Sequence, residues 1–254
     1  MIAAARVAVI AGGLLLGWQA LVGLLDLPHY ILPSPTRVLR AGWERLPLLL
    51  GHAGVTLLEI VLGLLLGTLL GALAALAMVR RAVLRRWLLP VVVLSQAIPV
   101  FALAPILVLW LGYGLASKVA MAVLIIFFPV TASFYDGLRR TELGWLDLAR
   151  TMTAGTRRQR WAELRHIRLP AALPALGSGL RIAAAVAPIG AVVGEWVGSS
   201  AGLGYLMLHA NARLQIDLMF AALLLLGLIA VALYFAVDRM VRRLVPWQAE
   251  QALP

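Results

Sequence analysis

The sequence has no cysteine and a single lysine, Lys118, in 254 residues. Without cysteine the chain can form neither a disulfide nor a thiolate metal site. Ser117 precedes the lysine and Val119 follows it, so it does not fit the Gly-Lys-Ser/Thr of a phosphate-binding loop. The chain therefore lacks the lysine that a nucleotide-hydrolysing loop needs, and we expect neither an ATP site nor a metal ion in it.

Charged residues are scarce as well. Only 13% of the residues are charged, 63% are hydrophobic, and the mean hydropathy is +0.96. A soluble domain of this length needs more polar surface to stay dispersed. The apolar residues fall in blocks, and several reach the roughly 20 residues that a helix needs to cross about 30 Å of hydrocarbon. The sequence therefore predicts an all-α, polytopic protein with the lipid bilayer as its surroundings.

We expect about six transmembrane helices in a single transmembrane domain over residues 1–254. The first apolar run is longer than the core of a signal peptide and is followed by Asp26-Leu27-Pro28, which predicts a retained span. The predicted spans are Val7–Leu25, Val55–Val79, Leu88–Leu111, Lys118–Phe134, Pro174–Val197 and Leu218–Val237.

The net charge of +11 has a topological explanation. Arginines concentrate after the second and fourth predicted spans, in the C-terminal tail and at Arg6, whereas the opposite loops hold few basic residues. Because basic loops stay in the cytoplasm, the pattern predicts that both termini and the loop 135–173 are cytoplasmic. Nucleic-acid binding is not needed to explain the charge.

The segment Ile31–Gly51 is too polar to be a span. Ser34 followed by Pro35 is typical of a helix start, with serine as the N-cap and proline at the first helical position. Apolar residues then recur at helical spacing, so we expect a short helix in the outer interface of the membrane. These residues are Val38, Leu39, Trp43, Leu46 and Leu50.

Three glycines of the second predicted span, Gly63, Gly67 and Gly71, share one helix face. This spacing lets another helix approach closely. The neighbour is predicted to be a helix of the same chain, with a seam between two copies as the alternative.

The third predicted span contains Pro90, Pro99 and Pro105, with Ser95-Gln96 between the first two. Proline removes a helix hydrogen bond and bends the helix. Irregular backbone at membrane depth survives only against protein or a water-lined cavity. Gln96 and Pro99 are therefore candidates for lining a translocation pathway. An interhelical hydrogen bond is the alternative for Gln96.

The loop 135–173 is too polar to enter the membrane and too short to form a domain. Thr141 is predicted to cap a first helix that has Leu146, Ala149 and Thr153 on one face, and Gly155 to end it.

The segment Thr156-Arg157-Arg158-Gln159 fits a capping box for a second helix, and Pro170 is predicted to stop that helix. A DNA-binding helix-turn-helix is disfavoured, because both ends are tethered to spans. The hairpin is better interpreted as a docking element for a cytoplasmic protein.

The same loop resembles the EAA loop of binding-protein-dependent ABC importer permeases. The resemblance is carried by Asp147-Leu148-Ala149-Arg150, Gly155 and Ile167-Arg168-Leu169-Pro170. Asp147 stands where that family has Glu, Leu148 stands where it has Ala, and the stretch to Pro170 is longer by about one helical turn. Nearly the whole chain resembles the nitrate, sulfonate and taurine branch of this family. The further matching segments are Leu32–Pro35, Ile98–Pro105, Gly194–Trp196 and Gly202–Leu206.

The resemblance implies a type I ABC importer permease fold in the bacterial inner membrane. It further implies a homodimer that works with a separate ABC ATPase subunit and a periplasmic solute-binding protein, with ATP bound by the partner. The loop would couple the ATPase to the spans, because its small residues allow the groove of the ATPase to approach it closely. The coupling residues expected from the match are Asp147, Ala149, Arg150, Gly155, Ile167, Leu169 and Pro170.

Within that branch, residues 190–220 look most like permeases for thiamine precursors of the hydroxymethylpyrimidine type. An anionic cargo would favour an arginine at depth, and Arg181 near the inner end is the only span arginine. A neutral pyrimidine needs amide and aromatic partners, which Gln96, Trp196 and Tyr205 could supply. The alternative cargo is an aliphatic sulfonate, taurine or nitrate.

Two other classes of function are disfavoured. An intramembrane serine protease would need a nucleophile beside a base, but Ser178 and His209 fall on opposite sides of the predicted membrane, and no HExxH zinc motif occurs. An ion-coupled transporter would need paired ionisable groups at the midplane, whereas Glu59, Arg181 and Glu195 lie toward the span ends. Glu195 is a candidate for the outer gate; capping by neighbouring backbone or by interfacial water is the alternative.

Overall fold

The structure, a computed structural model, describes residues 2–154 and 159–247, without the side chains of residues 2–8, 11 and 160. Within these ranges all regular structure is helical, which confirms the predicted all-α class. The helices are α1 (Ile2–Leu24), α2 (Pro35–Glu44), α3 (Leu46–Arg80), α4 (Ala82–Ala97), α5 (Val100–Leu111), α6 (Leu115–Arg139), α7 (Leu143–Met152), α8 (Gln159–Glu163), the π-helical η1 (Leu164–Arg168), α9 (Leu169–Gly198), α10 (Leu203–Ala212) and α11 (Ile216–Leu244).

Four helices of the described chain are long and apolar enough to cross a membrane: α3, α6, the continuous helix Trp161–Gly198 and α11. The bent pair α4 and α5 makes up to a fifth span. The first predicted span is also helical, and Gly12–Leu24 of α1 forms a shorter apolar stretch. Each predicted span is thus helical and the polytopic fold is confirmed, although fewer helices than about six meet the full length that a span needs.

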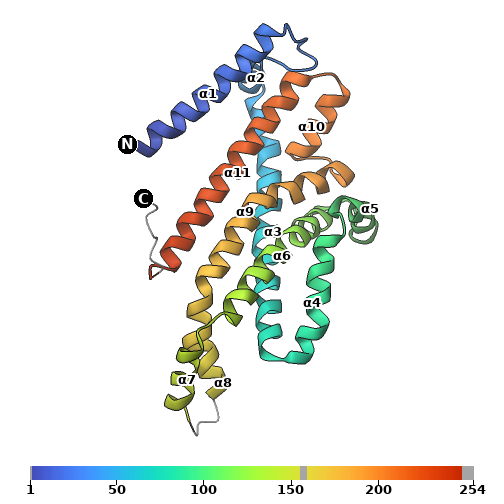
Figure 1. Cartoon of the computed structure of the whole chain (residues 1–254). Coiled ribbons are helices and arrows are strands. Elements are labelled where there is room, and N and C mark those ends of the chain that lie inside the picture. Colours follow the sequence, from blue (N-terminus) through green and yellow to red (C-terminus); the bar gives the residue numbers. More distant parts are fainter. Residues whose placement is uncertain (1, 155–158, 248–254) are drawn as a thin grey trace.

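Long helices α3, α6 and α9 pack side by side, and α11 packs along α9 (Figure 1). Helices α2 and α10 gather at one end of this bundle, and α7 and α8 form a hairpin at the other. We refer to these as the α10 end and the α7 end. An apolar core lies near each end, one joining α2, α3, α10 and α11 and the other joining α3, α4, α6, η1 and α9.

The third predicted span is bent, as its prolines predict, and it consists of two helices rather than one. The chain bends by 104° between α4 and α5, at Ile98 and Pro99. A proline disfavours helical geometry in the residue before it, and Ile98 is accordingly extended, with φ −84° and ψ 123°. Pro90 and Pro105 lie inside α4 and α5 without ending them. Of the three prolines, Pro99 therefore makes the break.

The glycine face of α3 packs inside the chain, against α6. A Cβ added to Gly63 would meet the Cβ of Ala122, and one added to Gly67 would lie 2.7 Å from Cγ2 of Ile126. A Cβ added to Gly71 would lie 3.1 Å from the Cβ of Val130. The spacing therefore closes an intrachain seam, as predicted, and this face is not left open for a second copy.

Pro170 does not stop the helix that precedes it, contrary to the prediction. The N–H of Leu169 donates to the carbonyl of Leu164, five residues back, so a π-turn carries the chain into α9. Pro170 is the second residue of α9, so its missing N–H falls at the junction between the π-turn and the α-helix. The helix then runs on from Trp161 to Gly198.

Two predicted helix caps are also corrected. Thr141 does not cap α7: Glu142 is at the N-cap position, and the Thr141 hydroxyl donates to the carbonyl of Leu138 at 3.4 Å. Ser34 is at the N-cap of α2 as predicted, but its hydroxyl lies 3.0 Å from that of Thr36 rather than on a helix N–H. The predicted stop at Gly155 and the capping box at 156–158 lie outside the described residues.

Candidate functional site

The hairpin at the α7 end presents an apolar surface. Leu146 and Ala149 of α7 are buried, on the face that the sequence predicted. Trp145, Leu148 and Met152 point away and are 55%, 59% and 78% exposed. Contiguous exposed apolar residues at the tip of a polar hairpin are typical of a protein-docking surface.

A chain of ion pairs joins α7 to the start of the long helix. Asp147 pairs with Arg150 at 3.0 Å, Arg150 lies 3.7 Å from Glu163, and Glu163 pairs with Arg168 at 2.7 Å. Exposed pairs contribute little individually, but Glu163 is largely buried and holds two arginines. Glu163 is not among the residues predicted from the sequence. Its position five residues before Arg168 was a weak signal, because only the π-turn brings the two together.

The other predicted coupling residues face different ways. Ile167 and Pro170 line a cavity of about 700 Å³ with Trp145 and His166. Leu169 instead packs against the apolar core of the α7 end. Gly155 lies outside the described residues. The loop therefore has an apolar docking face and a second face that joins it to α6 and α9, with Trp145 at the border between the two.

The predicted pathway residues occupy three places. Gln96 and Pro99 are exposed at the bend between α4 and α5. Trp196 lines an apolar groove of about 630 Å³ between α9, α10 and α11, together with Asn211. Tyr205 is partly buried, and its ring centroid lies 5.9 Å from that of His52 and 4.0 Å from that of His209.

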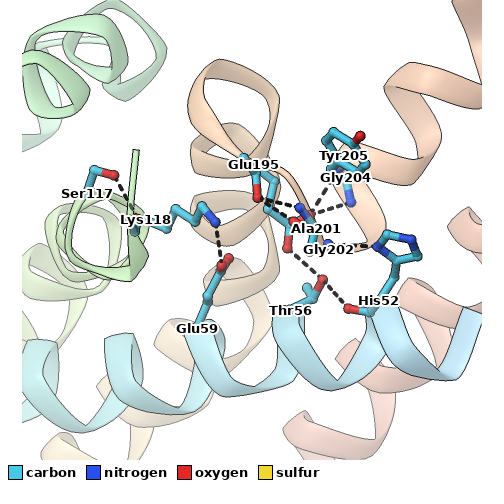
Figure 2. A network of polar contacts seen from close by, with 12 residues as sticks. His52, Thr56, Glu59, Ser117, Lys118, Glu195, Ala201, Gly202, Gly204 and Tyr205 are labelled. Atoms are coloured by element: carbon cyan, nitrogen blue, oxygen red, sulfur yellow. Dashed lines mark hydrogen bonds and ion pairs between the residues drawn. The ribbon is translucent and has the colours of Figure 1, made fainter. Parts of the chain in front are cut away.

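A buried polar network holds the start of α10 (Figure 2). Four consecutive backbone N–H groups there donate to side chains of other helices. Gly202 donates to Nδ1 of His52 at 3.0 Å, and Leu203 donates to the Thr56 hydroxyl at 2.8 Å. Gly204 and Tyr205 both donate to the carboxylate of Glu195. The first N–H groups of a helix have no partner within it, so α3 and α9 supply the partners from outside.

Glu195 is 1% exposed and also accepts a hydrogen bond from the Thr56 hydroxyl at 2.6 Å. Its carboxylate thus lies at the N-terminus of α10, where the helix dipole favours negative charge. Gly202 has φ +115°, and a Cβ on Gly202 would collide with this carboxylate. We call His52, Thr56 and Glu195, with the amides 202–205, the α10 clasp.

Next to the clasp, Lys118 of α6 pairs with Glu59 of α3 at 3.3 Å. The two side chains are 8% and 0% exposed, and within the described residues the Glu59 oxygens have no hydrogen bond beyond this ion pair. The pairing of these two residues was not predicted from the sequence. Opposite charges near the same ends of two predicted spans were the available signal.

Arg181 is also paired, with Asp238 of α11 at 2.6 Å. Asp238 in turn holds Arg242 at 2.8 Å. The protease alternative finds no support in the described residues, because the Ser178 hydroxyl donates to the carbonyl of Pro174 and His209 bonds the carbonyl of Tyr205. Neither group contacts the other as a nucleophile and base would.

The chain is similar to known membrane-transport proteins in both sequence and structure. Residues 67–250 match the family described as the binding-protein-dependent transport system inner membrane component. A probable ABC transporter permease protein of Haemophilus influenzae is 58% identical over 93% of this chain and 95% of its own length. The structure also resembles the inward-facing MetNI methionine ABC transporter, with a TM-score of 0.58 at 23% identity over 84% of this chain and 98% of that one.

Two further relatives carry more specific names. The formylaminopyrimidine transport permease protein ThiX of Halalkalibacterium halodurans is 39% identical over 92% of both chains. The riboflavin transport system permease protein RibX of Chloroflexus aurantiacus is 40% identical over 93% of this chain and 87% of its own length. The names of both proteins refer to nitrogen heterocycles.

Proposed function

We propose a cargo for this chain, which belongs to the binding-protein-dependent transport system inner membrane component family. Members of this family are permease subunits of ABC importers and not enzymes. The proposed cargo is a pyrimidine thiamine precursor of the hydroxymethylpyrimidine type. The observation that carries the proposal is the 39% identity to a formylaminopyrimidine permease along almost the full length of both chains. Riboflavin is the competing cargo, because the chain is 40% identical to a riboflavin permease.

The charges in the spans support a neutral cargo over the alternative of a sulfonate, taurine or nitrate. Lys118 and Arg181 are the basic residues of the described spans that lie away from the basic helix ends, and each is paired with a carboxylate. An anion would have to displace Glu59 or Asp238 to gain a cation. A pyrimidine needs only aromatic faces and amide groups, which Trp196 and Asn211 offer in one groove.

We place the partners at opposite ends of the bundle. Importers of this family work with an ATPase and a solute-binding protein. The exposed face of α7, with Trp145, Leu148 and Met152, suits the ATPase, and the α10 end then faces the binding protein. On this orientation both termini lie in the cytoplasm, and two copies of the chain enclose the pathway. ATP would bind the closed ATPase pair more tightly than the open pair. Because α7 connects the ATPase to the spans, this difference in binding free energy would shift the population of span conformations.

Uptake into cells tests the cargo. A bacterial strain that cannot synthesise the pyrimidine of thiamine and has no other importer for it is supplied with the chain, its ATPase and its binding protein. Growth on external hydroxymethylpyrimidine, lost when this chain alone is omitted, is the expected result. No growth on the pyrimidine, together with uptake of labelled riboflavin or use of taurine as sole sulfur source, would assign the cargo to that competitor.

A further inference from the structure

A basic cavity of about 570 Å³ lies at the α7 end, between the end of α3 and the hairpin of α7 and α8. Its lining includes Arg80 of α3, Arg150 of α7 and Arg168 of η1. Glu163, also in the lining, pairs with Arg150 and Arg168 at 3.7 and 2.7 Å. Asp147 pairs with Arg150 from outside the lining and is 69% exposed. The cavity therefore keeps an excess of positive charge.

The side chain of Arg80 makes the cavity suitable for an anion with several oxygens. It has neither an ion pair nor a hydrogen bond with the described residues, so all its N–H groups are available. A guanidinium presents five N–H donors in a planar fork that matches a phosphate. Glu163 meanwhile fixes the guanidinium groups of Arg150 and Arg168 at the same cavity. A phosphate is therefore the ligand that this lining fits.

The residues around the cavity place it at the level of the lipid headgroups. Arg80 is the last residue of α3, which is one of the helices long enough to span a membrane. Trp161 belongs to the lining, is 47% exposed and has the guanidinium of Arg165 over its ring at 4.9 Å. Trp87, near the start of the neighbouring α4, is 76% exposed. Tryptophan is enriched where hydrocarbon meets water, so both rings mark this interface.

A row of exposed leucines on α3 leads along the span to Arg80. Leu69 lies four residues before Leu73, and Leu73 lies seven residues before Arg80, so the three share one side of the helix. Leu69 and Leu73 are 55% and 53% exposed. From Leu69 to Arg80 the helix rises about 16 Å, enough for most of an acyl chain. A soluble anion would make no use of this row, whereas a phospholipid would.

The cavity faces away from the surface that is proposed to bind the ATPase. Arg150 follows Leu148 by two residues, which places it about 200° further around α7. Leu148 belongs to the exposed docking face, and Arg150 lines the cavity. The hairpin can therefore contact the ATPase and a lipid at the same time.

We propose that this cavity binds the phosphate of an anionic phospholipid, and that the bound headgroup ties the hairpin of α7 and α8 to the end of α3. Basic cavities at the cytoplasmic ends of spans are suited to such headgroups. The inference rests on the membrane-spanning fold and on the proposed cytoplasmic position of the α7 end. It does not depend on the cargo.

Photocrosslinking in nanodiscs tests the site. The chain is assembled with its ATPase in phosphatidylcholine nanodiscs that contain a small amount of phosphatidylglycerol with a photoreactive group at the top of one acyl chain. Crosslinked peptides are then mapped by mass spectrometry. Crosslinks at the apolar lining residues Val79 and Leu164 are expected, because they lie beside the arginines. A phosphatidylcholine probe with the same photoreactive group is the control and should crosslink there much less.

Arg80→Gln should lower the yield of these crosslinks about fivefold, the contribution of one arginine near an anionic membrane surface. Its melting temperature in discs without phosphatidylglycerol should equal that of the wild type, because Arg80 is exposed. Added phosphatidylglycerol should raise the melting temperature of the wild type but not that of Arg80→Gln. Arg243→Gln is the matched control: it removes an exposed arginine from α11, which does not line the cavity, and should keep both effects.

Equal crosslinking by the two lipid probes, or equal crosslinking of Arg80→Gln and the wild type, would overturn the lipid site. Displacement of the phosphatidylglycerol probe by inorganic phosphate would assign the cavity to a soluble anion instead. Dissociation of the ATPase from Arg80→Gln in discs without phosphatidylglycerol would assign Arg80 to the ATPase interface. Both leaflets of a nanodisc have the same composition and no cargo is present, so these results do not depend on the orientation or on the proposed cargo.

Discussion

The Thr56 hydroxyl on α3 donates to the carboxylate of Glu195 on α9 at 2.6 Å and, as an acceptor, receives the N–H of Leu203 at 2.8 Å. One side chain of α3 thereby ties α9 to the start of α10. Both contacts are buried, so each polar group depends on the other for its hydrogen bonding.

Thr56→Val should destabilise the protein, because it leaves the N–H of Leu203 and Oε1 of Glu195 without a partner. The expected loss is about 1–3 kcal/mol per unsatisfied group, seen as a lower melting temperature of the purified chain in detergent. Thr56→Ser keeps the hydroxyl and is the matched control, with stability close to that of the wild type. Equal stability of the valine and serine variants would refute the α10 clasp.

Gly202→Ala should also destabilise the protein. At φ +115° a Cβ is strained by about 1–3 kcal/mol, and here it would also displace the Glu195 carboxylate. Gly227→Ala, in the middle of α11 with nothing within 4 Å of the added carbon, is the control and should leave stability unchanged or higher. Thermal unfolding of both variants makes the comparison. A similar melting temperature for the two would show that Gly202 is not constrained.

A disulfide between α2 and α11 tests the packing of the α10 end and its orientation together. A Cβ at Gly42 would lie 3.6 Å from that of Ala221, within the range of disulfides. Gly42→Cys/Ala221→Cys should therefore form a bond in the oxidising periplasm and resist thiol labelling until it is reduced. Gly54→Cys/Ala221→Cys is the control, since nothing lies within 4 Å of a carbon added at Gly54. Free thiols in both variants would contradict the proposed orientation or the packing.

Leu148→Glu should separate the permease from its ATPase without unfolding it. The side chain is 59% exposed on α7, so a charge there should change stability by no more than about 0.5 kcal/mol. The ATPase should no longer purify with the tagged chain, and uptake should be lost. Leu39→Glu, equally exposed on α2, should keep the ATPase bound. Retention of the ATPase by Leu148→Glu would place the docking surface elsewhere.

Local patterns in the sequence predicted the local features of the fold. Apolar blocks located the spans, Ser34-Pro35 located the start of α2, and the spacing of Gly63, Gly67 and Gly71 predicted a close helix seam. Prolines were less informative, since Pro99 breaks a helix while Pro170 lies in the first turn of one. The difference lies in the π-turn before Pro170, which has no recognised local signature in the sequence.

The polar contacts of the candidate site could not be read from the sequence in the same way. Thr56 and Glu195 are 139 residues apart, and Glu59 and Lys118 come from different spans. Side-chain pairing at such separations depends on how the helices rotate and cross, which periodicity does not determine. The family resemblance predicted the coupling loop, but the role of Glu163 and the α10 clasp were found only in the structure.

Reconstitution tests the central claim most directly. The chain, its cognate ATPase and its binding protein are assembled in liposomes, and entry of labelled hydroxymethylpyrimidine from the binding-protein side is followed with ATP on the ATPase side. The account predicts uptake that requires ATP and all three proteins, together with no ATPase activity from the purified chain alone. Pyrimidine uptake without ATP or without this chain, or ATP hydrolysis by the isolated chain, would contradict it.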